Sequence, residues 1–256
     1  MDDKIIRENP CHARTVVRPR PVEQKVVPWT RARVAAMRLA MAERFKIVMV
    51  LGAGCGLRQG ELFGVPPDDF DRVAGVLHVV RQVRVIDGKQ VFALPKRNKT
   101  RDVPLAPSVL RLLDAHMEQF EPPAVTLPWR IPSGDPTTVR LLVTDDEGKP
   151  MWRNRFNGRV WNPARAAARV TSPTRQDGTH ALRRHYASVL LDAGESIKAL
   201  SEYLGHHDAG FTPRTYTHLM PASTGRTQRA IDGLFDDGPE SGPDGPTTAQ
   251  GGENGV

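Results

Sequence analysis

Cysteine is scarce in this chain of 256 residues, which contains only Cys11 and Cys55. Two cysteines make neither a disulfide framework nor, by themselves, a zinc site, so the composition predicts a reduced, cytoplasmic protein. Long hydrophobic runs are missing as well: the longest, Ile47 to Leu57, contains three glycines. A membrane span needs roughly 20 apolar residues. The acidic N-terminus, residues 1–4, has no hydrophobic signal-peptide region behind it.

Lysine is also scarce, and arginine carries most of the positive charge. Lys and Arg together number 36, of which 28 are Arg, against 29 Asp and Glu. Residues 236–256 hold five acids and no Lys or Arg, so the rest of the chain is more basic than the formal net charge of +7 of the whole. A basic, arginine-rich body favours a phosphate-bearing partner and disfavours a membrane-spanning protein.

Proline and glycine divide the chain into three parts. Four prolines interrupt residues 1–28, which we expect to be a linker. Residues 236–256 are rich in Gly and Pro and are expected to form a disordered acidic tail. Since hydrophobic residues make up 39% of the chain, the part between, residues 29–235, can bury a sizeable core and is predicted to be the folded domain.

Hydrophobic periodicity predicts a mainly α domain with one small three-stranded antiparallel β-sheet. The expected helices cover 30–44, 45–53, 107–120, 154–170, 180–192, 196–204 and 213–220. The expected strands cover 76–86, 89–94 and 101–105. Asp87-Gly88 predicts a hairpin between the first two strands, and a basic turn, residues 95–100, joins the second to the third. Residues 121–150 contain six prolines and are expected to be mostly loop.

Histidines are concentrated toward the C-terminal end: five of the eight lie between His180 and His218. His180 and Arg183 are three residues apart and so project from the same face of the expected helix. The arginine fork matches phosphate oxygens, and histidine can donate a hydrogen bond or move a proton near neutral pH. Spacing alone nevertheless favours a basic helix face in water over a reactive site.

Four motifs in a fixed order change that interpretation. Residues 179–183 (Thr-His-Ala-Leu-Arg), residues 204–206 (Leu-Gly-His) and Tyr216, ten residues after His206, closely resemble the C-terminal signature of the tyrosine recombinases, the phage-integrase family. Residues 56–62 (Gly-Leu-Arg-Gln-Gly-Glu-Leu) are similar to the box that carries the family's first arginine. Residues 95–105, which comprise the basic turn and the expected strand after it, are similar to the hairpin of the family's second and third strands, which carries its lysine.

The resemblance implies the tyrosine recombinase catalytic-domain fold and a site-specific recombinase or integrase that cuts and rejoins DNA through a 3′-phosphotyrosyl intermediate. Tyr216 is the implied nucleophile and His180 its base. The remaining residues bind the phosphate or protonate the leaving 5′-oxygen, the latter being the role of Lys96. The implied catalytic set is Arg58, Lys96, His180, Arg183, His206 and Tyr216. No metal, ATP or other cofactor is implied.

Other residues are given secondary roles. Lys99 shares the basic turn and is the alternative proton donor to Lys96. Glu61, three residues after Arg58, is expected to orient that arginine rather than react. Tyr186 and Tyr203 lie on apolar stripes and are expected in the core. Arg184 stands where the family usually has a histidine, which puts local packing and rate in question rather than the reaction class.

The family comparison also sets expectations for the whole protein. Members carry an N-terminal core-binding domain, which this chain is expected to lack, so a truncated, non-catalytic DNA-binding remnant is the alternative hypothesis. A regulatory or RNA-binding basic protein with coincidental motifs is a third. The implied partner is double-stranded DNA, bound by a homo-tetramer whose free form can be a monomer. The expected location is cytoplasmic and nucleoid-associated, in a bacterium or the host of a phage or mobile element.

Overall fold

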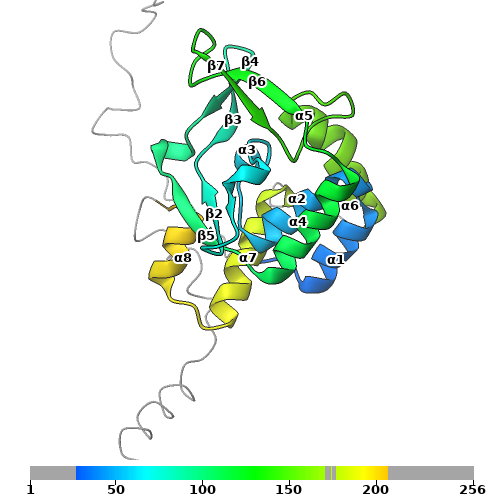
Figure 1. Ribbon diagram of the computed structural model, residues 1–256. Coiled ribbons are helices and arrows are strands. Elements are labelled where there is room, and N and C mark those ends of the chain that lie inside the picture. Colours follow the sequence, from blue (N-terminus) through cyan, green and yellow to red (C-terminus); the bar gives the residue numbers. More distant parts are fainter. Residues whose placement is uncertain (1–26, 171–173, 175–176, 207–256) are drawn as a thin grey trace, which may run out of the picture.

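The computed structural model describes residues 27–170, 174 and 177–206 (Figure 1). Tyr216, the expected helix over 213–220, the tail, and all but the end of the expected linker lie outside these residues. Figure 1 shows α1 (Arg31–Ala40), α2 (Lys46–Gly54), α4 (Pro107–Gln119) and α6 (Asn162–Ala167) gathered on one side, with the strands at the other and α8 (Ile197–Leu204) beside β5 (Arg101–Pro104). Within the described ranges, no helix is both long and apolar enough to cross a membrane.

The first helices form as the sequence predicts, with one difference in length. α1 (Arg31–Ala40) begins at Thr30, whose hydroxyl oxygen accepts a hydrogen bond from the Arg33 amide at 3.2 Å. It ends at Ala40 rather than residue 44, because the chain turns through a short 3₁₀ helix, η2 (Glu43–Phe45), before α2 (Lys46–Gly54). Most of α2 is buried, and a Cβ at Gly52 would approach Leu182 Cδ1 to 2.5 Å, so this glycine lets α2 pack closely against α7 (His180–Asp192).

The predicted strands exist, but they pair differently from the expectation. β1 (Phe70–Asp71), β2 (Val76–Val79) and β5 (Arg101–Pro104) form a three-stranded antiparallel sheet in the order β1-β2-β5. β3 (Gln82–Ile86) and β4 (Lys89–Ala93) form a separate hairpin. Its turn, Asp87-Gly88, has φ values of 48° and 72°, as predicted. The expected strand over 76–86 is therefore interrupted after Val79, and β4 does not pair with β5.

Residues 121–150 are mostly loop, as expected, but they also contain a pair of strands that was not predicted. β6 (Ala124–Pro128) and β7 (Pro136–Arg140) form an antiparallel hairpin in which the Thr126 and Thr138 hydroxyls lie 2.7 Å apart. Pro128 and Pro136 face each other at the end of this ladder, where a missing backbone N–H is tolerated. These two prolines therefore do not prevent the strands from pairing.

The later helices largely match the prediction. α4 (Pro107–Gln119) precedes the β6–β7 hairpin, and the segment after it forms α5 (Arg153–Phe156), a π-helical turn η5 (Asn157–Trp161) and α6 (Asn162–Ala167). α7 spans His180–Asp192. α8 (Ile197–Leu204) begins at Ser196, whose hydroxyl accepts from the Ala199 amide at 3.1 Å, and ends at Gly205 in the left-handed region, with φ 59°.

The hydrophobic core joins both ends of the described chain. Trp29 stacks on Trp161 with ring centroids 5.8 Å apart, and its indole N–H donates to the Asp177 carboxylate at 2.9 Å. The Trp29 carbonyl lies 2.8 Å from His185 Nδ1 on α7. These contacts fix the start of α7, and hence His180 and Arg183, relative to α1 and α6.

Candidate active site

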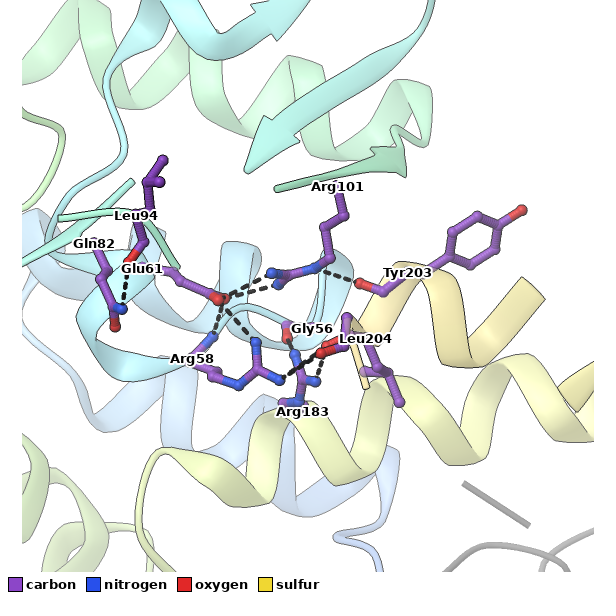
Figure 2. Close-up of polar contacts among 10 residues, drawn as sticks. Gly56, Arg58, Glu61, Gln82, Leu94, Arg101, Arg183, Tyr203 and Leu204 are labelled. Atoms are coloured by element: carbon purple, nitrogen blue, oxygen red, sulfur yellow. Dashed lines mark hydrogen bonds and ion pairs between the residues drawn. The ribbon is translucent and has the colours of Figure 1, made fainter. Parts of the chain in front are cut away.

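The carbonyl end of α8 is the point on which three arginines converge (Figure 2). Arg58 Nη2 donates to the carbonyl oxygens of Leu204 at 3.1 Å and Gly205 at 3.2 Å. Arg183 Nη2 donates to the same Leu204 oxygen, and Arg101 Nε donates to the Tyr203 oxygen at 2.6 Å. The last carbonyls of a helix lack intrahelical partners and carry the negative end of its dipole, so guanidinium groups bind there favourably.

A buried carboxylate balances this positive charge. Glu61 is 1% exposed, and its two oxygens accept four hydrogen bonds, two from Arg101 (2.9 and 2.7 Å), one from Arg58 Nη1 (2.9 Å) and one from the Arg58 amide (2.8 Å). Burial raises the pKa of Glu61, but the bonds and charge of Arg101, with the charges of Arg58 and Arg183, outweigh it and lower the pKa to about 2. Glu61 therefore contacts Arg58 as the sequence predicts.

The Gly-Leu-Arg box places Arg58 at the start of α3 (Gln59–Leu62), where the Glu61 side chain returns to the Arg58 amide. Gly56 has φ 63°, and a Cβ there would lie 2.6 Å from the ring of Tyr186, so only glycine fits. The Gly56 carbonyl accepts from Arg183 Nη1 at 2.7 Å. The glycine of the motif thus brings α7 and its arginine directly against the box.

The two predicted catalytic histidines lie in the field of these arginines. Desolvation of the ring, then the charges of Arg183, Arg184 and Arg58, lower the pKa of His180 to about 4, although the residue is exposed at the protein surface. Burial, then the charges of Arg183 and Arg58, lower the pKa of His206 to about 3. Both imidazoles are therefore neutral at pH 7, so each ring has one nitrogen able to accept a proton.

The basic turn lies on the surface next to this cluster. Lys96, Arg97, Asn98, Lys99 and Thr100 are all exposed. Lys99 Nζ donates to the His206 carbonyl at 3.3 Å, whereas the Lys96 ammonium has no such partner in the described part of the chain. Arg97 and Asn98 adopt positive φ values of 64° and 57°. The turn is a short 3₁₀ segment, η4 (Lys96–Asn98), and not the tip of a paired hairpin.

The structure thus brings four of the six predicted site residues together: Arg58, His180, Arg183 and His206. Lys96 lies on the adjoining turn, and Tyr216 lies outside the described residues. Tyr186 is in the core as expected, and Tyr203 is half-buried against it. Sequence reasoning missed Arg101. The one feature of the sequence that could have indicated it is the alternation in the expected strand, which places Arg101 on the same inward face as the buried Val103.

Comparison with known proteins identifies the family of this chain. A sequence profile described as "Phage integrase family" matches residues 32–222. The "Tyrosine recombinase XerC-like" protein of Caldanaerobacter subterraneus is 28% identical over 255 residues, with coverage of 92% of this chain and 62% of the relative. "Tyrosine recombinase XerD" of Staphylococcus saprophyticus is 27% identical over 176 residues, with coverage of 69% and 50%. The chain therefore spans about half to three-fifths of these relatives.

Solved structures show the same fold. The Tn1549 transposon integrase in complex with circular intermediate DNA superposes with a TM-score of 0.62 at 21% identity, covering 84% of this chain and 68% of that one. The catalytic domain of bacteriophage HP1 integrase superposes with a TM-score of 0.52 at 18% identity, covering 83% of this chain and 98% of that domain. The fold is that of a tyrosine recombinase catalytic domain. The chain belongs to the phage integrase family.

Proposed function

We propose that this protein is a site-specific DNA recombinase or integrase that cleaves and rejoins strands through Tyr216, without metal or ATP. The observation that carries the proposal is the pair Arg58 and Arg183, which share the Leu204 carbonyl and stand beside two neutral histidines. Such a cluster concentrates positive charge where a phosphodiester can bind. Residues 29–235 are the proposed catalytic domain, acting as a homo-tetramer on double-stranded DNA.

Arg58 is the arginine best placed for a first contact with the phosphate. Its side chain is 22% exposed, and its Nη atoms are held by Glu61 and by the end of α8. A guanidinium fixed in this way stabilises the charge that develops on the non-bridging oxygens without reorganising during the reaction. Arg183 is 0% exposed, so a direct phosphate contact from it requires that its guanidinium become accessible when DNA binds.

In the proposed cleavage step, the phenolic oxygen of Tyr216 attacks the phosphorus and the bond from phosphorus to the 5′-oxygen breaks. His180 accepts the phenolic proton, and Lys96 gives a proton to the departing 5′-oxygen. The products are a 3′-phosphotyrosyl enzyme and a free 5′-hydroxyl. A phenol has an ordinary pKa near 10, so a neutral base is needed at pH 7. The lowered pKa of His180 keeps it unprotonated until the anionic phosphate arrives.

Covalent capture of DNA tests the proposal. The protein is incubated at low salt with a pool of duplexes that carry random sequence around a nick, since the nick lets the short strand diffuse away and traps the adduct. We expect a protein–DNA adduct on a denaturing gel, and none with Tyr216→Phe. Tyr203→Phe is the matched control because Tyr203 bonds Arg101 through its backbone carbonyl, which the substitution retains.

The outcomes separate the proposal from the hypothesis of a non-catalytic DNA-binding remnant. An adduct that needs Tyr216 but not Tyr203 supports strand cleavage. Salt-dependent binding of the pool by the wild-type chain with no adduct, or an adduct that survives Tyr216→Phe, contradicts it.

A further inference from the structure

The basic turn that carries Lys96 lies between two strands, β4 and β5, that do not pair with each other. The strand before it, β4, pairs with β3, and the strand after it, β5, pairs with β2. No ladder of backbone hydrogen bonds therefore joins its two ends. All five residues 96–100 are exposed, and a loop of this kind would ordinarily move relative to its surroundings.

Arg101, the first residue of β5, supplies the missing attachment. Its side chain is 3% exposed and runs inward from the end of the turn. Nη1 and Nη2 donate to the two oxygens of Glu61 at 2.9 and 2.7 Å, and Nε donates to the Tyr203 carbonyl at 2.6 Å (Figure 2). One guanidinium thus binds α3 and the end of α8 at once, which the planar fork of arginine allows and lysine does not.

The same side chain also lies against the residue before His206. A Cβ at Gly205 would come within 2.9 Å of Arg101 Cδ, so the two residues are in close packing. Lys99 adds a second attachment of the turn to this region through the His206 carbonyl. Arg101 therefore lies between the turn, the Glu61–Arg58 pair and the segment that presents His206.

We propose that Arg101 is a positioning residue that fixes the Lys96 turn relative to the phosphate-binding arginines, so that Lys96 can protonate the leaving 5′-oxygen. The proposal rests on the proposed function for its catalytic consequence, but not for its structural one. Arg101 does not touch DNA in this role, since its side chain is only 3% exposed and each of its three nitrogens donates a hydrogen bond inside the protein.

The structural consequence is tested without DNA. Brief trypsin treatment of the folded protein reports opening of the turn, which contains Lys96, Arg97 and Lys99. We expect Arg101→Met to raise the cleavage rate in the turn about tenfold, in line with the loss of local opening free energy of about 1.4 kcal/mol. Arg81→Met is the matched control because Arg81 also forms a partly buried ion pair, with Asp69 at 3.1 Å, but is not attached to the turn.

The catalytic consequence is tested with a modified leaving group. The duplex recovered from the wild-type adduct is synthesised with sulfur in place of the bridging 5′-oxygen at the cleaved phosphate. A thiolate leaves without being protonated, so this substrate does not need the acid. A small misplacement of a reacting group can lower a rate about 100-fold, and we expect Arg101→Met to do so with oxygen. With sulfur, its rate should return to that of Arg81→Met, as should that of Lys96→Ala.

Each outcome decides one question. If the turn is cut no faster in Arg101→Met than in Arg81→Met, the structural proposal is wrong. If the turn opens but sulfur restores Lys96→Ala and not Arg101→Met, Arg101 acts through Arg58 and Glu61 instead, which also overturns the proposal. Arg101→Lys, which keeps the charge and loses the fork, serves if the methionine variant does not fold. A wild-type chain without an adduct contradicts the proposed function, whereas the trypsin result stands by itself.

Discussion

Glu61 and Arg101 form a two-pronged ion pair whose side chains are 1% and 3% exposed. The pair links residues 40 positions apart, on α3 and β5, and Glu61 shares its oxygens with Arg58. Moving both charges out of water is costly, and the remaining hydrogen bonds of the pair offset that cost. The pair therefore stabilises a particular geometry of the site, and removing either partner leaves an uncompensated charge inside the protein.

Neutralising Glu61 is expected to destabilise the protein strongly. In Glu61→Gln, Arg101 and Arg58 lose their shared counter-charge, and breaking a buried pair typically costs about 3–5 kcal/mol of unfolding free energy. Denaturant unfolding measures this loss. Asp69→Asn is the control, because the Asp69–Arg81 pair is more exposed (11% and 19%) and, among the described residues, no second arginine pairs with Asp69. A loss for Glu61→Gln no larger than for Asp69→Asn would contradict the importance of the cluster.

Stability is expected to fall as the pH drops from about 6.5 toward 4. His180 and His206 have folded-state pKa values below their ordinary 6.5, at about 4 and about 3. The unfolded chain therefore binds more protons than the folded chain in this window, so acid favours unfolding. Denaturant unfolding at several pH values measures the slope. His206→Asn should make the slope shallower.

A carboxyl with the opposite behaviour provides the control for that experiment. Burial raises the pKa of Asp69 to about 6, despite the opposing charge of Arg81. The contribution of Asp69 to the unfolding free energy therefore falls as the pH rises toward 6, which partly masks the opposite contribution of the histidines. Asp69→Asn should therefore make the slope steeper. An unchanged slope in His206→Asn would show that His206 is protonated equally in the folded and unfolded chains.

Gly205→Ala is expected to lower stability and DNA cleavage more than Gly88→Ala. Gly205 and Gly88 both have positive φ, 59° and 72°, so alanine is strained at either position by about 1–2 kcal/mol. Only at Gly205 would the new Cβ also meet Arg101, at 2.9 Å. We expect Gly205→Ala to lose more unfolding free energy than Gly88→Ala and to lower covalent capture of DNA. Equal losses in stability and unchanged capture would exclude the proposed packing role.

DNA binding is expected to depend on salt through the basic turn. If Arg97 contacts one phosphate, Arg97→Gln should lower the slope of log K against log salt by about 0.9. Fluorescence anisotropy over a range of salt concentrations measures the slope. Lys149→Gln is the control, since the Lys149 ammonium is already paired with Glu147 at 2.7 Å. An equal change in both variants would argue against the turn as a DNA contact.

Local signals explain which parts of the fold could be predicted. Thr30, Ser196 and Gly205 mark helix ends through hydrogen bonds and φ angles made within a few residues, which is why the start of the helix expected over 30–44 and both ends of the helix expected over 196–204 are confirmed. The Asp87-Gly88 hairpin is equally local. The pairing of β5 with β2 rather than β4 was not predicted, because it depends on a break after Val79 that the hydrophobic pattern does not mark.

The sequence by itself determined the family, the order of the longer helices and most of the candidate site, because the motifs at residues 56–62, 179–183 and 204–206 are contiguous. Only the tertiary structure decided what holds the site together. Arg101 lies 40 residues from Glu61 and 102 from Tyr203 along the chain, yet it binds both. No local pattern distinguishes such an arginine from a surface charge, since its role depends on the burial and the helix end that long-range packing brings to it.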